Sequence, residues 1–298
     1  MIKKIIFGAG CFWGVEKYFA QIIGIRSAIS GYSGGEYPDP TYEKVLQNRE
    51  NIEFANHNEV VQVTYDSEII STQRLLQHFW EIHNPTQINR QGSDIGNNYR
   101  SSIYWENEEQ YLEILKTKVV FQSLLTSANF GKIVTEIKKL DKFYPAEDYH
   151  QKYLENNPSG YCPNHHTGVK FVDGEFYQML GKNILTTEEF SVAFNHGTDP
   201  SFCQKYDKFS TTPNGFFVDK LSGEKLFSTN DRFNSGTGWL SFYQAINGSI
   251  IENVDNTLGM TRTEVVAKVS GMHLGHVFDE GNTRRFCINA SVLDFIEI

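Results

Sequence analysis

The chain has 298 residues, a length that suits about two domains. Hydrophobic residues make up 40% and charged residues 21% of it, which is typical of a folded globular protein and not of a disordered one. The net charge is −9, and both halves of the chain are acidic. A surface that follows nucleic-acid phosphates or an anionic membrane is therefore not expected.

The start of the chain is basic and then apolar, as in a signal peptide. Gly8 and Gly10 interrupt the apolar stretch before a longer hydrophobic core can form. A short first strand is the better interpretation. No apolar run of about 18 residues follows, so no transmembrane span is predicted, and we expect a cytoplasmic protein.

The first part of the chain, residues 1–173, mixes two periodicities. Short β-rich runs predict strands, and apolar residues three and four apart predict helices. The strands are expected at 2–7, 59–65, 99–105 and 133–140, and the helices at 13–23, 72–82, 107–123 and 149–156. Their irregular alternation is typical of an α+β fold.

The pattern changes after a boundary near residues 174–185, which we interpret as a linker. Thr186 to Glu189 resemble a capping box for a helix that ends by Gly197. Short β-like pieces, separated by Gly, Asn, Asp and Pro, then occur at 215–218, 225–227, 264–270, 276–278 and 285–289. Residues 186–298 are therefore predicted to form a mainly antiparallel β domain, a small barrel-like one.

The cysteines are isolated from one another in the sequence. They are Cys11, Cys162, Cys203 and Cys287. None belongs to a CxxC pair, so neither a thiolate zinc site nor a disulfide framework is expected. Without further signals, each would be interpreted as a small buried hydrophobic residue.

Cys11 follows a glycine-rich turn and precedes a predicted helix. The N–H groups and the dipole of a helix N-terminus favour a thiolate there. A dinucleotide-binding loop would need its third glycine where Trp13 stands, and the alternative is that Gly8 and Gly10 only form a tight turn. Phe12 and Trp13, next to such a thiol, predict a pocket for a small apolar group.

The segment Gly-Cys-Phe-Trp-Gly at 10–14 resembles the active-site signature of A-type peptide methionine sulfoxide reductases. Further segments resemble blocks of that family at 31–35, 40–42, 91–101 and 146–151, so the likeness covers residues 3–170. It implies an α/β sandwich with a ferredoxin-like core in an A-type domain at 1–173. It also implies site roles, which are the attacking thiol (Cys11), the methyl pocket (Phe12, Trp13), the proton donor (Glu59) and the polar side of the pocket (Tyr42, Asp94, Tyr99).

The proposed role of Glu59 suits sulfoxide chemistry. A sulfoxide sulfur accepts a thiolate only if its oxygen is protonated or strongly hydrogen-bonded, which a carboxylic acid kept neutral by burial can achieve. Without the resemblance, Glu59 would be interpreted as an exposed charge that opens a strand. It follows His57 and Asn58 where the family usually has His-Ala, and a short insertion precedes them.

Recycling of Cys11 requires a second thiol, because a sulfenic acid condenses with one. Cys162 lies in a Gly/Pro-rich stretch and matches the recycling cysteine of the family. Many relatives carry another cysteine eight residues later, where this chain has Lys170. A relay of two cysteines is therefore expected in this half.

Cys287 is the chemical candidate of the second half. In a strand, Arg285, Cys287 and Asn289 share one face, and an arginine next to a cysteine lowers its pKa. His273 and His276 could add positive charge or transfer a proton. As a metal pair they lack partners at motif spacing, and a hydrogen-bonded turn is the alternative interpretation.

Segments 235–242, 259–265, 273–278 and 285–289 resemble B-type methionine sulfoxide reductases, over residues 184–298. The resemblance implies Cys287 as catalytic thiol, with His273, His276, Arg285 and Asn289 around it and Trp239 in the methyl pocket. Many relatives hold zinc through two CxxC pairs, and the matching positions here are Asp219, Ser222, Ala267 and Ser270. No metal and no cofactor are therefore expected.

The resolving thiol of the second half is a separate question. Many relatives carry it where this chain has Thr237, which leaves Cys203 as the candidate. The alternatives are that the reductant resolves Cys287 directly and that Cys203 is merely buried.

The two resemblances together imply a fused bifunctional methionine sulfoxide reductase for protein repair under oxidative stress. The first half would reduce the S epimer and the second the R epimer, in proteins or as free methionine sulfoxide. The resemblance implies thioredoxin as the reductant, and the electrons must come from outside because the chain has no CxxC redox motif. Two alternatives stay open, namely a weak or inactive second half that binds oxidised proteins, and a general thiol peroxidase.

Overall fold

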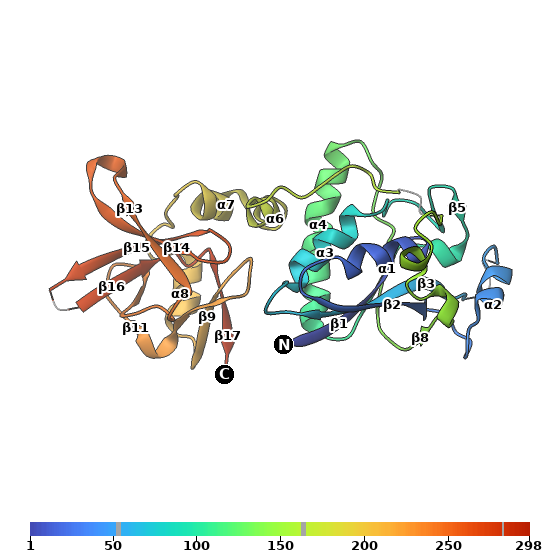
Figure 1. Ribbon diagram of the computed structural model, residues 1–298. Coiled ribbons are helices and arrows are strands. Elements are labelled where there is room, and N and C mark those ends of the chain that lie inside the picture. Colours follow the sequence, from blue (N-terminus) through green and yellow to red (C-terminus); the bar gives the residue numbers. More distant parts are fainter. Residues whose placement is uncertain (52–54, 162–164, 282) are drawn as a thin grey trace. The chain divides into compact units, whose positions relative to one another are not determined.

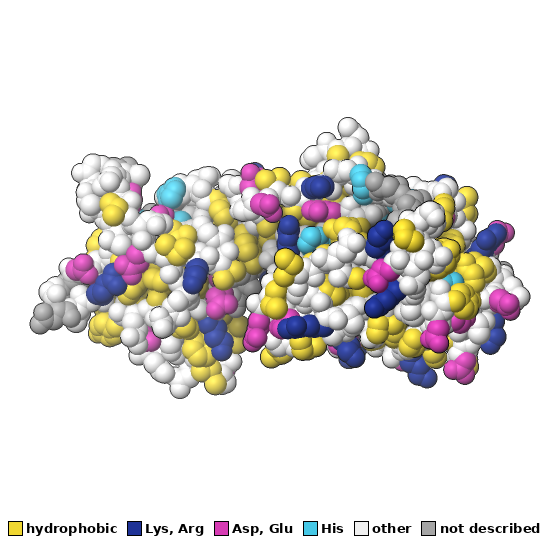
Figure 2. Space-filling view, viewed as in Figure 1, with side chains coloured by type: hydrophobic (Ala, Val, Ile, Leu, Met, Phe, Trp, Pro, Cys, Tyr) yellow, Lys and Arg dark blue, Asp and Glu magenta, His cyan; other side chains and the backbone are white. Residues whose placement is uncertain are grey.

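The structure is a computed structural model that describes residues 1–51, 55–161, 165–281 and 283–298. The chain forms two compact units, Met1–Val172 and Asp173–Ile298 (Figure 1). Basic and acidic side chains are interspersed on the visible face of each (Figure 2). Among the described residues, no helix has the length and apolar character needed to cross a membrane.

The first unit is built on one twisted sheet with the strand order β7-β6-β1-β3-β2-β8. Neighbouring strands are antiparallel, except that β6 and β7 are parallel. The strands are β1 (Ile2–Gly8), β2 (Ile25–Ser33), β3 (Asn58–Asp66), β6 (Ser102–Trp105), β7 (Glu136–Lys139) and β8 (Phe143–Pro145). A separate short ladder pairs β4 (Arg90–Gln91) with β5 (Asp94–Ile95).

The helices of the first unit pack beside this sheet (Figure 1). They are α1 (Phe12–Ala20), α2 (Tyr42–Gln47), α3 (Thr72–Glu81), α4 (Glu108–Ser127) and α5 (Tyr153–Asn156), with short 3-10 turns at Asn97–Tyr99 and Asp148–His150. Phe7 of β1 stacks on Phe19 of α1 and on Phe79 of α3, with ring centroids 5.0 and 4.8 Å apart. Helices α1 and α3 therefore cover the face of the sheet to which Phe7 points.

The opposite face of this sheet carries a smaller core. Ile6 precedes Phe7 and so points the other way, where it packs with Val60 and Tyr104. Leu140, which follows β7, and Phe143 of β8 cover this cluster. The unit is thus a mixed α/β sandwich, which confirms the predicted fold class.

The second unit begins with helices and continues with strands. The helices are α6 (Phe176–Ile184), α7 (Thr187–Phe194) and α8 (Gln204–Ser210). Helix α6 occupies most of the segment 174–185 that we interpreted as a linker. The predicted capping box is confirmed, because the Thr186 side chain accepts the Glu189 N–H while the Glu189 carboxylate accepts the Thr186 N–H.

The β part of the second unit consists of antiparallel sheets. One has the order β10-β9-β17 and the other β11-β12-β16-β15-β14-β13. The strands are β9 (Gly215–Asp219), β10 (Lys225–Ser228), β11 (Arg232–Phe233), β12 (Leu240–Phe242), β13 (Ile250–Asp255), β14 (Arg262–Ala267), β15 (His273–Glu280), β16 (Thr283–Ile288) and β17 (Leu293–Glu297). This arrangement confirms the predicted, mainly antiparallel β domain.

Candidate active sites

Cys11 lies at the junction of β1 and α1, where the sequence places it. It is the N-cap residue of α1 and is half-buried. The turn before it needs glycine, because Gly10 has φ +92° and an added Cβ would come within 2.9 Å of the Gln91 Cβ. The glycine turn therefore positions the Cys11 thiol at the N-terminus of α1.

Glu59 of β3 lies beside this turn and is only 2% exposed. The Phe12 N–H donates to Oε2 at 3.3 Å, and the Asn98 amide donates to Oε1 at 3.1 Å. Burial raises the pKa of Glu59 to about 8, although these two donors oppose the shift. Glu59 is therefore a neutral acid at pH 7, and its interpretation as an exposed charge is wrong.

The start of α1 favours the Cys11 thiolate, as the sequence predicts, but larger effects oppose it. Burial, and after it the charge of Glu59, raises the pKa of the Cys11 thiol well above its ordinary value. The N–H groups of Trp13 and Gly14 at the helix start lower this pKa by less. Desolvation thus outweighs the helix terminus, and the resting site holds two protonated groups, a thiol and a carboxylic acid.

Aromatic rings form a wall next to Cys11. Phe12 is buried, while Trp13 is half-buried and stacks on Tyr153 with ring centroids 3.9 Å apart. The Trp13 indole donates to His150 Nδ1 at 3.1 Å, and the His150 ring also packs on Phe12 and Tyr42. The indole plane is therefore fixed by a stacking partner and a hydrogen-bond acceptor.

Tyr42 and Tyr99 interact electrostatically with Cys11 and Glu59. Burial, with the charge of Glu59 as the second cause, raises the pKa of Tyr42 to about 12 and raises that of Tyr99 further. Both phenols therefore keep their protons at neutral pH and can donate hydrogen bonds. This outcome suits their predicted place on the polar side of the pocket.

The Asp94 carboxylate is contacted by residues near the C-terminal end of the first unit. It accepts the Tyr161 hydroxyl at 2.9 Å and lies 3.3 Å from His165 Nε2. The His165 ring also lies 3.7 Å from the position that a Cβ on Gly10 would take, so His165 lies beside the Cys11 turn. Cys162 itself lies outside the described residues.

Sequence reasoning missed the partners that hold this site together. Asn98 donates to Glu59, His150 accepts from Trp13, and Glu147 accepts both the Tyr32 hydroxyl and the Tyr42 N–H. All three lie in the segments 91–101 and 146–151, whose likeness to the family blocks was the available signal.

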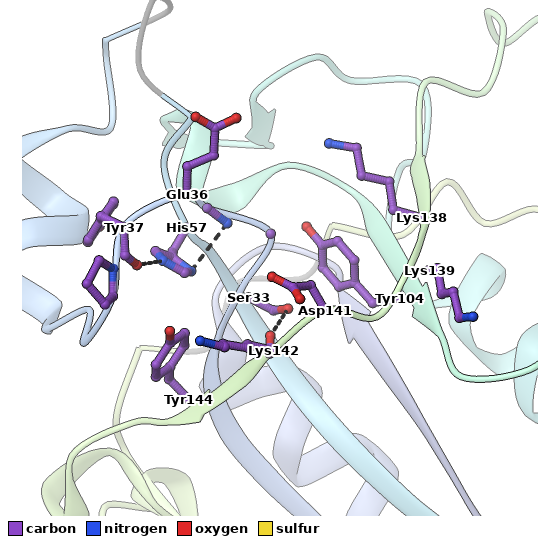
Figure 3. A pocket seen from close by; sticks show the side chains of 13 residues that line it. Ser33, Glu36, Tyr37, His57, Tyr104, Lys138, Lys139, Asp141, Lys142 and Tyr144 are labelled. Atoms are coloured by element: carbon purple, nitrogen blue, oxygen red, sulfur yellow. Dashed lines mark hydrogen bonds between the residues drawn. The ribbon is translucent and has the colours of Figure 1, made fainter.

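A separate cavity of about 460 Å³ lies where β2 ends and β3 begins (Figure 3). His57 on its wall accepts the Gly35 N–H through Nδ1 and contacts the Tyr37 carbonyl through Nε2. None of the predicted catalytic residues lines this cavity. Its polar contacts fix the start of β3, and Asn58 adds bonds to the Arg100 carbonyl and the Ser102 hydroxyl just before Glu59.

Cys287 lies on β16 in the middle of the larger sheet of the second unit. It is half-buried and lies opposite His276 of β15 on one side and Ser241 of β12 on the other. Arg285, two residues earlier, is half-buried while Phe286 between them is buried. The shared face predicted for Arg285 and Cys287 is therefore confirmed, and the Arg285 guanidinium stands over the Phe278 ring at 4.9 Å.

Both predicted histidines of this site are paired with carboxylates. His276 Nε2 lies 2.7 Å from Asp255, which also accepts from Arg262 at 2.7 Å. His273 Nδ1 lies 2.7 Å from Glu264, and the two imidazole rings are 5.3 Å apart. Sequence reasoning identified the histidines and missed their acidic partners, which come from other strands.

The side chains of Trp239 and Asn289 both hydrogen-bond to the backbone of Asp199. The Trp239 indole donates to the Asp199 carbonyl, and the Asn289 side-chain oxygen accepts the Asp199 N–H, both at 2.9 Å. Trp239 lines an open depression of about 300 Å³ together with Tyr206 and Ser241. Since Ser241 is the cross-strand neighbour of Cys287, this depression adjoins the thiol.

Thr237 and Cys203 lie around the same loop. The Ser235 hydroxyl contacts Thr237 at 2.8 Å and Ser241 at 2.7 Å, which links Thr237 to the residue opposite Cys287. Cys203, the N-cap residue of α8, follows Phe202, whose N–H donates to the Gly238 carbonyl at 2.9 Å. The segment that carries Cys203 is thus bonded to the loop that carries Thr237.

The positions that hold zinc in many B-type relatives do not fit that ion here. Asp219 is buried and accepts the N–H groups of Leu221 and Ser222 through Oδ1, and Ala267 offers no donor atom. The Ser270 hydroxyl accepts the Met272 N–H. Hydrogen bonds within each turn thus occupy Asp219 Oδ1 and the Ser270 hydroxyl, and the remaining Asp219 Oδ2, which is buried without a partner, cannot supply the four ligands of a structural zinc site.

Comparisons with known proteins match both units. The model of the family "Peptide methionine sulfoxide reductase" matches residues 3–177, and that of the "SelR domain" matches residues 185–297. Methionine sulfoxide reductase A of Corynebacterium diphtheriae is 38% identical, with 56% of this chain and 81% of that chain covered and a TM-score of 0.51. Reduced Mxr1 from Saccharomyces cerevisiae is 33% identical, with 57% and 93% covered and a TM-score of 0.50.

Proposed function

The chain belongs to the peptide methionine sulfoxide reductase family, with an A-type domain followed by a B-type SelR domain, and we propose that its two active sites divide the epimers between them. The two domains give it both methionine sulfoxide reductase activities. In the proposal, Cys11 reduces the S epimer and Cys287 the R epimer of methionine sulfoxide, free or in proteins. Sulfoxide sulfur is chiral, and a pocket built for one epimer presents its acid on the wrong side of the other.

In the first site, the sulfoxide methyl packs on Phe12 and Trp13 while its oxygen meets Glu59. Glu59 gives its proton to the oxygen and takes the proton of Cys11, so the site stays neutral throughout. The Cys11 sulfur attacks the substrate sulfur, and the oxygen moves to Cys11. The products are methionine and a Cys11 sulfenic acid, so the oxygen gained by the enzyme equals that lost by the substrate.

The observation that carries this step is the burial of Glu59 beside the Cys11 turn, where it is 2% exposed and accepts the Phe12 N–H. A carboxyl whose pKa is about 8 is a proton donor at neutral pH, in contact with the backbone one residue from Cys11. Tyr42 and Tyr99 keep their protons and supply further donors to the developing charge on oxygen.

Recycling uses Cys162 in this proposal. Its thiol attacks the Cys11 sulfenic acid, the oxygen leaves as water, and a disulfide forms. The contacts of Tyr161 and His165 with Asp94, beside the Cys11 turn, support a role for the segment between them. Thioredoxin then reduces the disulfide by dithiol exchange.

In the second site, His273 and His276 are each held by a carboxylate, and this supports their role as donors to the sulfoxide oxygen. Burial lowers the pKa of His273, and the contact with Glu264 opposes that shift. Trp239 supplies the methyl wall, and Arg285 favours the thiolate of Cys287. Cys203 resolves the sulfenic acid, and its link through Phe202 to the loop at 235–239 supports this assignment. A cytoplasmic location, where thioredoxin is reduced, completes the proposal.

The test is thioredoxin-dependent turnover of separated S and R epimers of a methionine sulfoxide peptide by wild type, Cys11→Ser and Cys287→Ser. We expect each variant to lose one epimer only. Loss of both activities in Cys11→Ser would contradict the proposal. Wild type that binds the R epimer without reducing it would identify the second domain as a binding module.

A further inference from the structure

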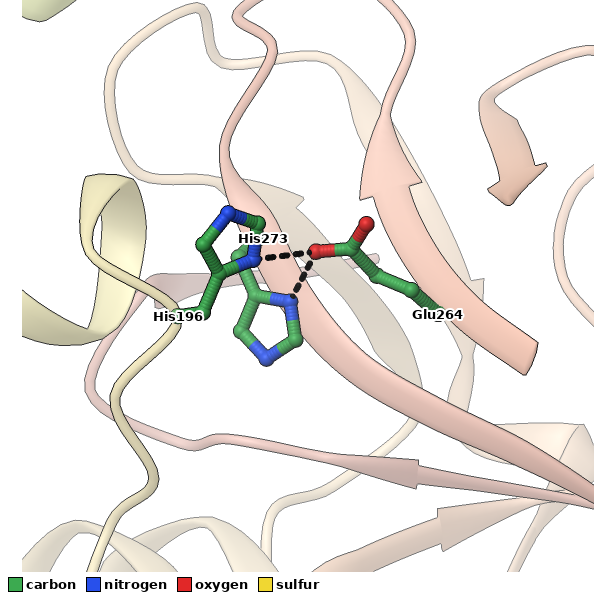
Figure 4. Close-up of side chains that lie close together, drawn as sticks. All are labelled: His196, Glu264 and His273. Atoms are coloured by element: carbon green, nitrogen blue, oxygen red, sulfur yellow. Dashed lines mark hydrogen bonds and ion pairs between the residues drawn. The ribbon is translucent and has the colours of Figure 1, made fainter. Parts of the chain in front are cut away.

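His196, Glu264 and His273 form a compact cluster in the second unit (Figure 4). His196 follows α7, Glu264 lies on β14 and His273 on β15. The Glu264 Oε1 atom lies 2.8 Å from His196 Nδ1 and 2.7 Å from His273 Nδ1. Two imidazoles from separate segments therefore converge on one carboxylate oxygen.

A structural explanation accounts for only part of this cluster. His273 is buried, so one carboxylate is enough to satisfy its Nδ1, and Glu264 does this. The His196 side chain is 68% exposed, and burial does not force it toward Glu264. The His196 backbone also has φ +53°, in the left-handed region that residues other than glycine rarely adopt, and this conformation is a second feature that burial does not explain.

The donor set matches that of a metal site. One ligand atom from each residue lies within 4.8 Å of the other two. Zinc bonds of about 2.0–2.2 Å place neighbouring ligand atoms roughly 3–3.5 Å apart, so a small withdrawal of the carboxylate opens the required space. Two imidazoles and one carboxylate are ligands that zinc and cobalt accept.

We propose that His196, Glu264 and His273 bind one divalent transition-metal ion of the zinc class, with water at its remaining positions. Each imidazole binds through Nδ1 and keeps its proton on Nε2, and the carboxylate leaves a net charge of +1. This site is separate from Asp219, Ser222, Ala267 and Ser270, where zinc binds in many relatives.

The ion would regulate the second active site, an effect that rests on the proposed function. The His273 ring lies 5.3 Å from that of His276, and His276 is the cross-strand neighbour of Cys287. An ion bound at Nδ1 prevents the His273 ring from becoming an imidazolium, so His273 can no longer transfer a proton to the sulfoxide oxygen. Reduction of the R epimer therefore slows while reduction of the S epimer in the first domain continues.

The binding test uses full-length chain with its four cysteines changed to serine, so that thiols do not compete for the metal. Titration with Co²⁺ should give d–d absorption bands without thiolate charge transfer and saturate at one ion per chain. His196→Asn should weaken binding at least tenfold, because asparagine tolerates the left-handed backbone and lacks the imidazole. Asn195→Ala, at the exposed neighbouring position, should bind like the parent.

Equal Co²⁺ affinity in His196→Asn, or no binding at millimolar Co²⁺, would overturn the metal site. Neither readout needs turnover, so both are independent of the proposed reductase function. In a chain with native cysteines, Zn²⁺ should slow R-epimer turnover several-fold, and His196→Asn should resist it. Equal inhibition of the two proteins would show that zinc acts at a thiol and would overturn the regulatory effect.

Discussion

The two candidate active sites place the same reacting atom in different surroundings. Cys11 precedes a helix and lies beside one deeply buried acid, whereas Cys287 lies within an antiparallel sheet between a histidine and a serine. Burial keeps the proton on Glu59, while the histidines near Cys287 are held by carboxylates from other strands. The two sites thus place different polar groups near the thiol, a desolvated acid in the first unit and imidazoles paired with carboxylates in the second.

The largest effect that distinguishes the sites is expected from Glu59→Gln. Glutamine keeps the shape and the Phe12 contact but has no acidic proton, so kcat for the S epimer should fall about 10²–10⁴-fold. Turnover of the R epimer should not change. Glu16→Gln is the matched control, since Glu16 is a buried carboxyl that bonds Ser30 in the same unit. Retained S-epimer reduction in Glu59→Gln would assign the proton to a tyrosine.

The recycling thiols offer a second comparison. Cys203→Ser should lower thioredoxin-dependent turnover of the R epimer about tenfold or more. The rate at which methionine forms in a single turnover, before recycling, should stay normal. Adding Thr237→Cys to this variant should restore recycling, because Thr237 is linked through Ser235 to the residue opposite Cys287. A Cys203→Ser enzyme with normal thioredoxin-dependent turnover would show that the reductant resolves Cys287 directly.

The pH dependence should distinguish the sites by the titration of Glu59. Because its pKa is raised to about 8, the proton donor is present below that pH and is lost above it. Single-turnover kcat/KM for the S epimer should therefore fall about tenfold per pH unit above 8, and Glu59→Gln should lack this limb. The same titration should lower the stability of the first unit as pH rises from about 4.5 to 8, since the folded state binds the proton more tightly. A flat S-epimer profile through pH 9 would contradict the acid role.

The smallest expected effect concerns the hydrogen bond of the Trp13 indole. In the first site the acceptor is a histidine, His150, whereas the Trp239 indole of the second site donates to a backbone carbonyl. His150→Gln weakens the hydrogen bond to Trp13, whose net contribution is about 0.5–1.5 kcal/mol, so KM for the S epimer should rise about two- to tenfold. The change in kcat should be smaller. His78→Gln, at a histidine that bonds Tyr18 in the same unit, is the control. A drop in kcat at constant KM would indicate that His150 takes part in the proton transfer.

Local patterns predicted those parts of the molecule that depend on neighbours in sequence. The expected helix at 72–82 is α3, the Thr186 capping box is formed, and Cys11 is the N-cap residue of α1. Strand β13 was missed because its residues are largely exposed and lack clear alternation. Helix α6 was interpreted as a linker, although Phe176 and Leu180, four residues apart, are buried on one side of it.

The sequence by itself determined the two domain types, the reacting cysteines and most residues around them, because these lie in short contiguous motifs. Only the tertiary structure decided their protonation and their partners. The helix terminus at Cys11 predicts a thiolate, but burial against Glu59 favours the thiol, since desolvation depends on what the rest of the chain places around a group. The carboxylates paired with His273 and His276 likewise come from other strands, and strand register brings them into contact.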